Sequence, residues 1–491
     1  MTASRPAEGT SLRRSVALAF SYYYVTNAIT FVVGIILARY FLSPQEFGAF
    51  SICMAAYLFL QSLSDFGVSR FVIQERSLDS RKLRAALAVL AVGNLAIAAG
   101  LFGIRGWAAA FFGAPDISTI LAMLAATALV VPPMMLGDAL LIRGSRFSAL
   151  FVTHVGGATA GAAVGIAAAS AGAGAVSLAW LTAAQTLVRA VLTVSLCREV
   201  RGVRPGLSGM RTVLAFGSPI ALVIFYSALL ARLPEILLGR LVGLAAAGLY
   251  SRASGLAEQV RWALYTGGAS AVLPEVARRF HAGEPLVHPF LRLTAYVTAL
   301  IWPASGFLAL LSLPVTHLIF GPAWSDMAPL LSVLSLSYAI FSMVVLYVDV
   351  LLLQKRMRFY VVLEVSQGTV GLVLFIGGAM LGVFEAALSR LAYAVIFAAL
   401  YVVVLRHAVG HRYGQVAAVY GRSLVVTAIA LLPASAALLA RGIWQVGDAA
   451  AVLPAALLSP GFWYLGLRVM RHPLRDEADR AAKLLRGWLG F

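Results

Sequence analysis

The chain has 491 residues, of which 61% are hydrophobic and only 12% are charged. Soluble globular domains carry about half apolar and about a quarter charged residues, so this composition excludes a water-soluble fold and indicates a membrane protein. The net charge of +18 does not require a nucleic-acid partner. Lys and Arg gather on the cytoplasmic loops of membrane proteins, where they also meet anionic lipids.

Apolar helices are the expected elements, because a span needs about 20 apolar residues and must satisfy its backbone hydrogen bonds internally. We expect about 14 of them, joined by short loops. They lie near 15–38, 47–67, 85–104, 117–142, 149–170, 175–197, 213–235, 245–275, 291–312, 327–353, 360–381, 384–405, 423–440 and 449–469. The expected fold class is an all-α polytopic membrane protein.

The basic residues predict the orientation. Most of the 38 Lys and Arg residues fall in alternate connections, such as 70–84 and 198–211, and short basic loops stay in the cytoplasm. Both termini are therefore expected to be cytoplasmic. Cys53 and Cys197 lie in expected spans and indicate neither a disulfide nor a metal site.

Two stretches of the chain, about 200 residues apart, resemble each other. Phe47-Gly48 corresponds to Ala247-Gly248, and the run from Asp138 to Arg143 corresponds to the run from Asp349 to Gln354. Duplicated helical bundles are typical of transporters that expose a central site to each side of the bilayer in turn. Transport is therefore the leading hypothesis.

The repeat predicts three regions. Residues 1–208 form a six-helix lobe, and residues 209–408 form a second six-helix lobe related to the first by pseudo-two-fold symmetry. Residues 409–491 add two further membrane helices and a cytoplasmic amphipathic tail. The basic connector 198–211 is the expected hinge-like link between the lobes.

Polar side chains inside the spans are the candidate functional residues, because charge at membrane depth is costly unless it meets a partner or a cavity. Segment 245–275 is the richest. Arg252 and Gln259 share one helical stripe, and Glu258 and Arg261 share a second. Glu258 and Arg261, three residues apart, could neutralise each other. Arg252 has no acidic residue at helical spacing in its own segment, so we expect it to bind an anion.

Arg232, in the preceding segment, has Glu235 three residues away, and local pairing is an alternative to a substrate contact. The first two segments carry uncharged polar stripes. These include Tyr23 and Asn27 on the first segment, and Tyr57 and Gln61 on the second. Such stripes suit a hydrated wall that binds sugar, and hydrogen bonds between helices explain them about as well.

Other buried polar residues are expected to be structural. Asp138 and Asp349, at corresponding places of the repeat, are interpreted as anchors or gate partners. Arg189 could extend its head to the membrane surface. Glu364 and Arg390 could pair between neighbouring spans.

Glycines at every fourth position predict a close helix contact. Gly157, Gly161 and Gly165 lie on one face of segment 149–170. Small residues at this spacing let two membrane helices approach each other closely.

Several short motifs together resemble one family. They are 34–39, 42–44, 47–48, 65–67, 236–240, 248–253 and 320–324. They are similar to the motifs of Wzx-type polysaccharide flippases in the multidrug/oligosaccharidyl-lipid/polysaccharide exporter superfamily. The similarity covers essentially the whole chain and is specific to the family, but it indicates the substrate only weakly.

The resemblance implies a central cavity lined by spans one, two, seven and eight. It also implies that a polyprenyl-diphosphate-linked oligosaccharide is flipped from the cytoplasmic to the outer leaflet of the inner membrane, for exopolysaccharide or O-antigen assembly. Arg252 and Arg261 match the cavity arginines that meet the diphosphate. The implied partners are this lipid-linked oligosaccharide, membrane lipids, and the polysaccharide polymerase and export machinery. The first span lacks a buried arginine, unlike relatives that flip the peptidoglycan precursor, which makes that substrate less favoured.

Two alternatives remain. A drug or small-metabolite antiporter of the same superfamily would need no lipid portal, and the excess of buried arginine argues for an anion instead. A membrane polysaccharide polymerase would need a substantial catalytic loop. The sequence has no nucleophile elbow, phosphate-binding loop or zinc cluster, so we expect no enzyme activity, metal or cofactor.

Overall fold

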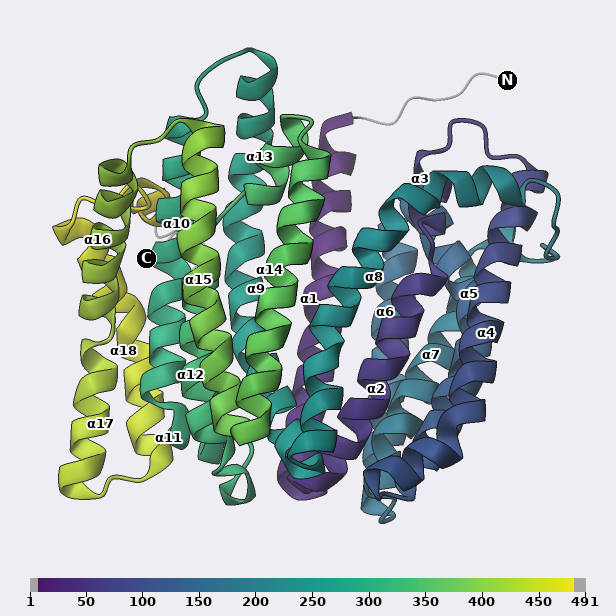
Figure 1. Cartoon of the computed structure of the whole chain (residues 1–491), viewed down its shortest axis with the longest axis horizontal. Helices are drawn as coiled ribbons and strands as arrows, with labels where there is room; N and C mark the ends of the chain where they lie inside the picture. The colour runs from purple at the N-terminus through teal and green to yellow at the C-terminus, as the bar shows by residue number, and fades with distance from the viewer. Residues whose placement is uncertain (1–7, 481–491) are drawn as a thin grey trace. The chain divides into compact units, whose positions relative to one another are not determined.

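The computed structural model describes residues 8–480. It describes their side chains as well, except those of residues 8–20, 212, 215–224, 266–277 and 281. All the regular structure in this part of the chain is helical, which confirms the all-α fold class (Figure 1). The first helices are α1 Glu8–Tyr40, α2 Pro44–Ser64, α3 Val68–Gln74, α4 Ser80–Phe112, α5 Asp116–Arg143, α6 Phe147–Ser170, α7 Val176–Leu196, η1 Arg198–Val200 and α8 Met210–Leu241. The others are α9 Leu244–His281, α10 Val287–Leu310, α11 Ser312–Ile319, η2 Pro322–Trp324, α12 Met327–Phe341, α13 Tyr347–Leu353, α14 Met357–Leu381, α15 Val383–Val409, α16 Tyr413–Ala430, α17 Leu432–Trp444 and α18 Asp448–Val469.

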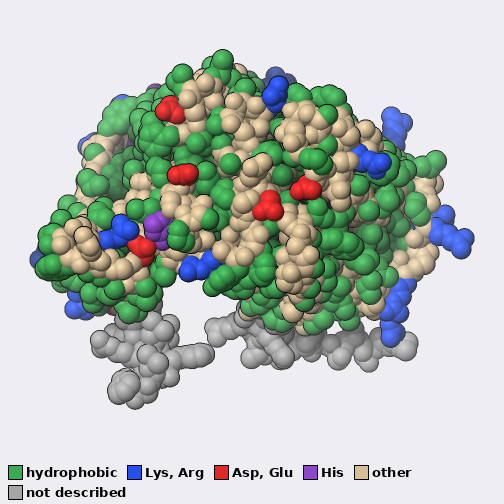
Figure 2. Space-filling view, turned by 90° about the horizontal axis from the view of Figure 1, so that it is seen from below, with side chains coloured by type: hydrophobic (Ala, Val, Ile, Leu, Met, Phe, Trp, Pro, Cys, Tyr) green, Lys and Arg blue, Asp and Glu red, His purple; other side chains and the backbone are tan. Residues whose placement is uncertain are grey.

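Many of these helices can span a bilayer. Within the described residues, 10 helices are long and apolar enough, and α16 with α17, bent by 42°, would make an eleventh. Hydrophobic side chains are spread over the face seen in Figure 2, with Lys, Arg, Asp and Glu side chains scattered among them. The chain is therefore a multi-pass membrane protein. The count of about 14 spans remains a prediction, although every expected segment lies on at least one helix.

Two expected segments are broken rather than continuous. Segment 327–353 forms α12 and α13, and the break includes Leu346 with a left-handed φ of 57°. Segment 423–440 lies across α16 and α17, and Pro433 opens the second helix. Proline has no N–H to continue a helix. Apolar content alone does not reveal either break.

The chain divides into two compact units, residues 1–248 (unit 1) and 249–491 (unit 2). Helix α8 packs in unit 1 against α2 and α4. A Cβ added to Gly239 of α8 would lie 2.1 Å from the Cδ1 of Ile52, so glycine is what permits this contact. The expected three-region division at 208 and 408 remains a prediction about the repeat.

The connector expected to act as a hinge folds back onto α4. The backbone N–H of Gly206 donates to the carbonyl of Arg84 at 3.1 Å, and the Arg84 Nε donates to the carbonyl of Arg204 at 3.3 Å. The connector is therefore fastened to unit 1 at its middle.

The glycines of α6 make the predicted close contact with α7. A Cβ added to Gly157 would lie 2.8 Å from the carbonyl oxygen of Gln185, and one added to Gly161 would lie 2.8 Å from that of Leu181. Both distances are too short for real carbon–oxygen contacts. The backbones of α6 and α7 therefore approach each other more closely at these positions than a residue with a side chain would allow. The prediction from the four-residue spacing is confirmed.

A second close contact joins α2 to the start of α9. A Cβ on Gly48 would lie 1.8 Å from the carbonyl oxygen of Leu244, and a Cβ on Gly248 would lie 2.0 Å from that of Pro44. The contact is reciprocal, because Pro44 and Gly48 correspond in the repeat to Leu244 and Gly248. Reciprocal contact between corresponding residues is what a two-fold relation produces, although the symmetry of whole lobes remains a prediction.

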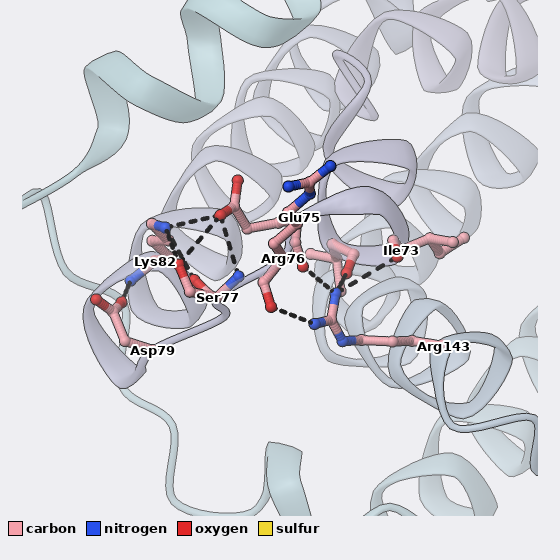
Figure 3. A network of polar contacts seen from close by, with 8 residues as sticks. Ile73, Glu75, Arg76, Ser77, Asp79, Lys82 and Arg143 are labelled. Carbon is pink, nitrogen blue, oxygen red and sulfur yellow. Dashed lines mark hydrogen bonds and ion pairs between the residues drawn. The ribbon is translucent and has the colours of Figure 1, made fainter.

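Arg143 fastens the end of α3 to the end of α5 (Figure 3). Its Nη1 donates to the carbonyls of Val72 at 2.8 Å and Glu75 at 2.5 Å, and its Nη2 reaches the carbonyl of Arg76 at 3.5 Å. A guanidinium suits this position, because the last carbonyls of a helix have no partner inside it and carry partial negative charge.

Unit 2 has its own apolar core around α10, α13, α15, α16 and α18. Two indole N–H groups cross between its helices: Trp302 donates to the carbonyl of Ala339 at 2.9 Å, and Trp463 donates to that of Ala299 at 2.7 Å. Helices α16 and α18 pack against each other and α16 packs on α10. The two helices expected as an addition are therefore part of unit 2. Residues 481–491 of the expected tail lie outside the described residues.

Candidate functional site

The polar stripe on α1 is exposed on unit 1. Tyr23 is 48% exposed, and Asn27 is also exposed. The Asn27 amide donates to the carbonyl of Tyr23 at 2.8 Å, and the Thr30 hydroxyl donates to that of Thr26 at 3.0 Å. Both hydrogen bonds stay within α1. The donor groups of Asn27 and Thr30 therefore do not link α1 to a neighbouring helix. The Tyr23 and Asn27 side chains are therefore exposed on unit 1.

The corresponding stripe on α2 is covered. Tyr57 is only 5% exposed, and Gln61 is half-buried with its Nε2 3.9 Å from the sulfur of Met135. Gln61 Oε1 is buried and has no hydrogen-bond partner among the described residues. Arg232, on α8 of the same unit, is half-buried.

Three candidates lie on α9 in unit 2, and all of them are half-buried: Arg252, Gln259 and Arg261. Arg261 Nη2 lies 3.5 Å from Glu258 Oε1, so the local pair predicted from their spacing is confirmed. The separation is long for a salt bridge, and Glu258 is 46% exposed. The carboxylate therefore balances the charge of Arg261 only in part.

An aromatic residue from another helix lies beside Arg261. Its guanidinium lies 5.6 Å from the ring centre of Tyr338 on α12, within cation–π range. The Tyr338 hydroxyl is 3.5 Å from Glu258 Oε2. Arg390 of α15 lies 5.3 Å from the ring centre of Phe341 on α12. The sequence did not connect Tyr338 with Arg261, because this contact joins two distant helices.

The expected pair of Glu364 and Arg390 is wrong. Glu364 Oε2 accepts a hydrogen bond from the Tyr401 hydroxyl at 3.4 Å, whereas Arg390 stacks on Phe341. Aromatic rings fill the space between, including contacts of Phe397 with Phe341 at 5.3 Å and with Tyr401 at 4.4 Å. The spacing of four residues between Tyr393, Phe397 and Tyr401 was the available sequence signal for this aromatic face of α15.

A charged cluster in unit 1 joins α5, α6 and α7. Arg189 Nη2 donates to Asp138 Oδ2 and lies 2.8 Å from His154 Nε2. The three side chains are 22%, 14% and 18% exposed, respectively. Arg189 therefore does not extend to the membrane surface as expected. Asp138 has a partner on another helix that the sequence did not identify, and its role as an anchor or a gate partner remains a prediction.

A further polar cluster in unit 2 was not predicted. His317 Nδ1 lies 3.0 Å from Asp448 Oδ2, and His317 Nε2 lies 2.9 Å from the hydroxyl of Ser325. Arg441 Nη2 lies 2.9 Å from Asp448 Oδ1. The Ser325 hydroxyl donates to the carbonyl of Pro322 at 2.6 Å, so its proton is held by the backbone, and the cluster ties α11 to the connection between α17 and α18.

No group of three or more His, Cys, Asp or Glu side chains in the described residues has a metal-binding arrangement. Asp349, the repeat partner of Asp138, is partly buried on α13.

Solved structures share this fold. The chain is similar to the lipid II flippase MurJ in an inward closed conformation, with a TM-score of 0.72 and 12% identity over 92% of this chain and 99% of that one. It is also similar to an inward-facing multidrug resistance MATE family transporter of the MOP superfamily, with a TM-score of 0.54 and 14% identity over 79% and 94% of the two chains. The fold is therefore that of a helical, multi-pass membrane protein.

A family model described as polysaccharide biosynthesis protein matches residues 36–329, and the chain belongs to that family. A curated relative is the succinoglycan biosynthesis transport protein ExoT of Rhizobium meliloti (strain 1021), 28% identical over 328 residues. The match covers 64% of this chain and 64% of that relative, so it spans less than two thirds of the relative's length. The polysaccharide-related family expected from the sequence motifs is confirmed.

Proposed function

We propose that this protein flips a polyprenyl-diphosphate-linked oligosaccharide from the cytoplasmic to the outer leaflet of the inner membrane, for assembly of a surface polysaccharide such as exopolysaccharide or O-antigen. The family, a relative named as a succinoglycan transport protein, and a fold shared with a lipid II flippase support the proposal. In this proposal both termini are cytoplasmic and two lobes rock to expose the substrate to each side in turn.

The observation that carries the proposal is the presence of three arginines on two membrane helices of unit 2. Arg252 and Arg261 lie on α9 and Arg390 lies on α15, while Glu258 offsets Arg261 only in part. A diphosphate is the anion that such groups suit, because each guanidinium stays charged and offers paired N–H donors. A cationic drug would need the opposite charge.

Other residues suit the sugar. Tyr23 and Asn27 are exposed aromatic and amide side chains on α1. Gln259 and Arg232 add half-buried amide and guanidinium donors. Tyr57 and Gln61 are covered in this conformation. We propose that they contact the glycan only in a conformation in which α2 has moved. Hydroxyl-rich ligands are recognised by aromatic faces and paired polar groups of this kind.

Reconstitution tests the proposal. The purified protein is placed in vesicles that contain a polyprenyl-diphosphate-linked oligosaccharide with a fluorescent sugar, and an impermeant quencher measures how much of it reaches the other leaflet. We expect exchange with the wild-type protein and not with protein-free vesicles. A cytoplasmic build-up of lipid-linked sugar in cells that lack the gene, with loss of surface polysaccharide, is the matching result in vivo.

Two outcomes would reject the proposal. Equal exchange in vesicles with and without protein would show that the chain does not move this lipid. Proton- or sodium-driven uptake of a free drug or small metabolite, without lipid exchange, would favour the antiporter alternative. Membrane-associated polymerase and export proteins are the partners to look for by cross-linking once exchange is established.

A further inference from the structure

We propose that Trp107, Phe111 and Arg240 form a binding site for an anionic phospholipid, at the end of unit 1 where α4 and α8 finish. The Arg240 guanidinium binds the lipid phosphate, and the two rings lie against the glycerol and the first carbons of the acyl chains. The site shares no residue with the arginines of α9 and α15 assigned to the substrate, and it does not depend on the proposed function.

The lengths of α4 and α8 place the site at a membrane surface. Both helices begin beside a basic connection, 70–84 for α4 and 198–211 for α8, and they pack against each other. With 33 and 32 residues, each is about 50 Å long, against about 30 Å for the hydrocarbon core of a bilayer. Their last turns therefore reach the headgroups of the opposite leaflet. With both termini in the cytoplasm, as the basic residues predict, this is the outer leaflet.

Trp107, Phe111 and Arg240 are in contact in that order. The rings of Trp107 and Phe111 are stacked, with centres 4.8 Å apart and 20° between their planes. The guanidinium carbon of Arg240 lies over the Phe111 ring, 4.7 Å from its centre. A cation–π contact leaves most of the five N–H donors of a guanidinium unused. Those donors suit a phosphate, which arginine binds through paired hydrogen bonds.

Packing between helices holds Arg240 at this position. A Cβ added to the preceding Gly239 would lie 2.1 Å from Cδ1 of Ile52 and 3.5 Å from Cε1 of Phe112. The last turn of α8 therefore lies directly against α2 and α4. Phe112 also meets Phe111 edge to face, with ring centres 5.0 Å apart. The guanidinium and the rings are thus positioned before any ligand binds, which lowers the entropic cost of binding.

The charge of Arg240 has no acidic partner. Arg240 is exposed, and no described acidic side chain lies within ion-pair distance of it. Anions are therefore attracted to this position, and an anionic lipid is favoured over a zwitterionic one, whose own ammonium group repels the guanidinium and competes for the phosphate.

Apolar surface beside the arginine identifies the anion as a lipid. Trp107 is 64% exposed and Phe111 is 38% exposed, and Leu241 and Val242, which follow Arg240, are 47% and 40% exposed. A phospholipid carries its phosphate directly above its acyl chains, so it covers the cation and the apolar surface together. A soluble anion would leave that surface in water.

Arg105 provides a matched comparison near the same end of α4. Its guanidinium carbon lies 3.5 Å from the centre of the Phe102 ring, but Arg105 is half-buried. In the part of the chain that the structure describes, no second ring stacks on Phe102. A lipid preference that depends on the stacked pair of rings should therefore require Arg240 and not Arg105.

Photolabelling tests the site. The purified protein is placed in phosphatidylcholine vesicles that contain a small fraction of photoactivatable phosphatidylglycerol or photoactivatable phosphatidylcholine, with the reactive group near the ester end of the acyl chain. Peptide mass spectrometry then measures the labelling of residues 102–115 and 237–244. In the wild-type protein we expect phosphatidylglycerol to label these segments about tenfold more than phosphatidylcholine does, because a charge-assisted phosphate contact is made by one lipid and weakened in the other.

Four variants locate the preference. Arg240→Gln should remove it, and Arg105→Gln should keep it. Arg240→Lys should retain part of it, because lysine keeps the charge without the paired donors. Trp107→Ala should reduce labelling by both lipids. The thermal midpoint of Arg240→Gln should equal that of the wild-type protein, since the side chain is exposed.

Two results would overturn the lipid site. One is equal labelling by the two lipids in the wild-type protein, or an unchanged preference in Arg240→Gln. The other is labelling of these segments by a photoactivatable lipid-linked oligosaccharide that phosphatidylglycerol does not reduce, which would assign the rings to a glycan. A protein that flips no lipid-linked oligosaccharide but keeps the preference for phosphatidylglycerol would reject the proposed function and support the lipid site.

Discussion

Gly48 of α2 and Gly248 at the start of α9 lie against each other, and each is also close to a backbone carbonyl of the opposite helix: Gly48 to that of Leu244, and Gly248 to that of Pro44. The two glycines occupy corresponding places in the internal repeat. The resemblance seen in the sequence is therefore also a physical contact in unit 1.

Gly48→Ala should destabilise unit 1. Its Cβ would meet the Leu244 carbonyl oxygen at 1.8 Å, which is backbone and cannot rotate away. Overpacking of this kind costs about 1–3 kcal/mol, and we expect a lower thermal midpoint for the purified protein. Gly100→Ala on α4 is the matched control, because a Cβ there meets nothing within 4 Å. Equal midpoints for the two variants would refute the close contact.

Arg252→Ala should abolish lipid flipping while the protein still inserts and purifies normally. Arg252→Lys should retain part of the activity, because a lysine keeps the charge but loses the paired donor geometry. Vesicle exchange of the fluorescent lipid-linked oligosaccharide measures both. Arg358→Ala, at an exposed position, is the control and should behave as wild type. Full activity in Arg252→Ala would remove Arg252 from the substrate site.

The Asp138–Arg189 pair can be tested with a double-mutant cycle. Asp138→Asn leaves the Arg189 charge without its carboxylate and should cost about 3 kcal/mol of stability, the lower end for breaking a buried pair, because the two side chains are 14% and 22% exposed. Replacing both residues by leucine should restore much of that loss. Denaturation of the purified variants measures it. Additive single effects would show that the two groups do not interact.

Arg143→Ala should loosen the end of α3. The guanidinium contacts the carbonyls of Val72, Ile73, Glu75 and Arg76 (Figure 3), and these acceptors would be left to water. We expect faster hydrogen exchange in residues 72–79 and no change in α18. The same rate in both proteins would mean that the end of α3 is held by other contacts.

The neighbouring loop should respond to acid. The hydrogen bond from Lys82, 2.9 Å away, lowers the pKa of the exposed Glu75 carboxyl below its ordinary value of 4.5. A lowered folded-state pKa means that the contact stabilises the loop above the ordinary value and is lost as pH falls through the lowered one. Lys82→Ala should raise the pKa of Glu75, which carboxyl NMR can follow. An unchanged pKa would show that Lys82 is not the cause.

Local patterns predicted the features that depend on one helix at a time. The four-residue spacing of Gly157, Gly161 and Gly165 predicted the close contact between α6 and α7, and the three-residue spacing of Glu258 and Arg261 predicted their pair. Apolar length predicted the helices. These predictions succeed because a helix places residues three and four apart on one face whatever surrounds it.

The partners of the remaining charges depended on packing between helices. Arg189 was expected at the membrane surface. It instead pairs with Asp138, which lies 51 positions earlier in the chain. Arg390 was assigned to Glu364 and stacks on Phe341, while Glu364 meets Tyr401. No spacing along the chain encodes which faces of two distant helices meet.

The sequence by itself determined that this protein lies in the membrane, that it is helical, that two of its stretches resemble each other, and which family it belongs to, because these follow from composition, periodicity and short motifs. Only the tertiary structure decided which polar groups balance each other, where helices break at Leu346 and Pro433, and that Asp138, His154 and Arg189 come together. Those outcomes depend on the approach of separate helices, where a displacement of a few ångströms decides whether a buried charge finds a partner.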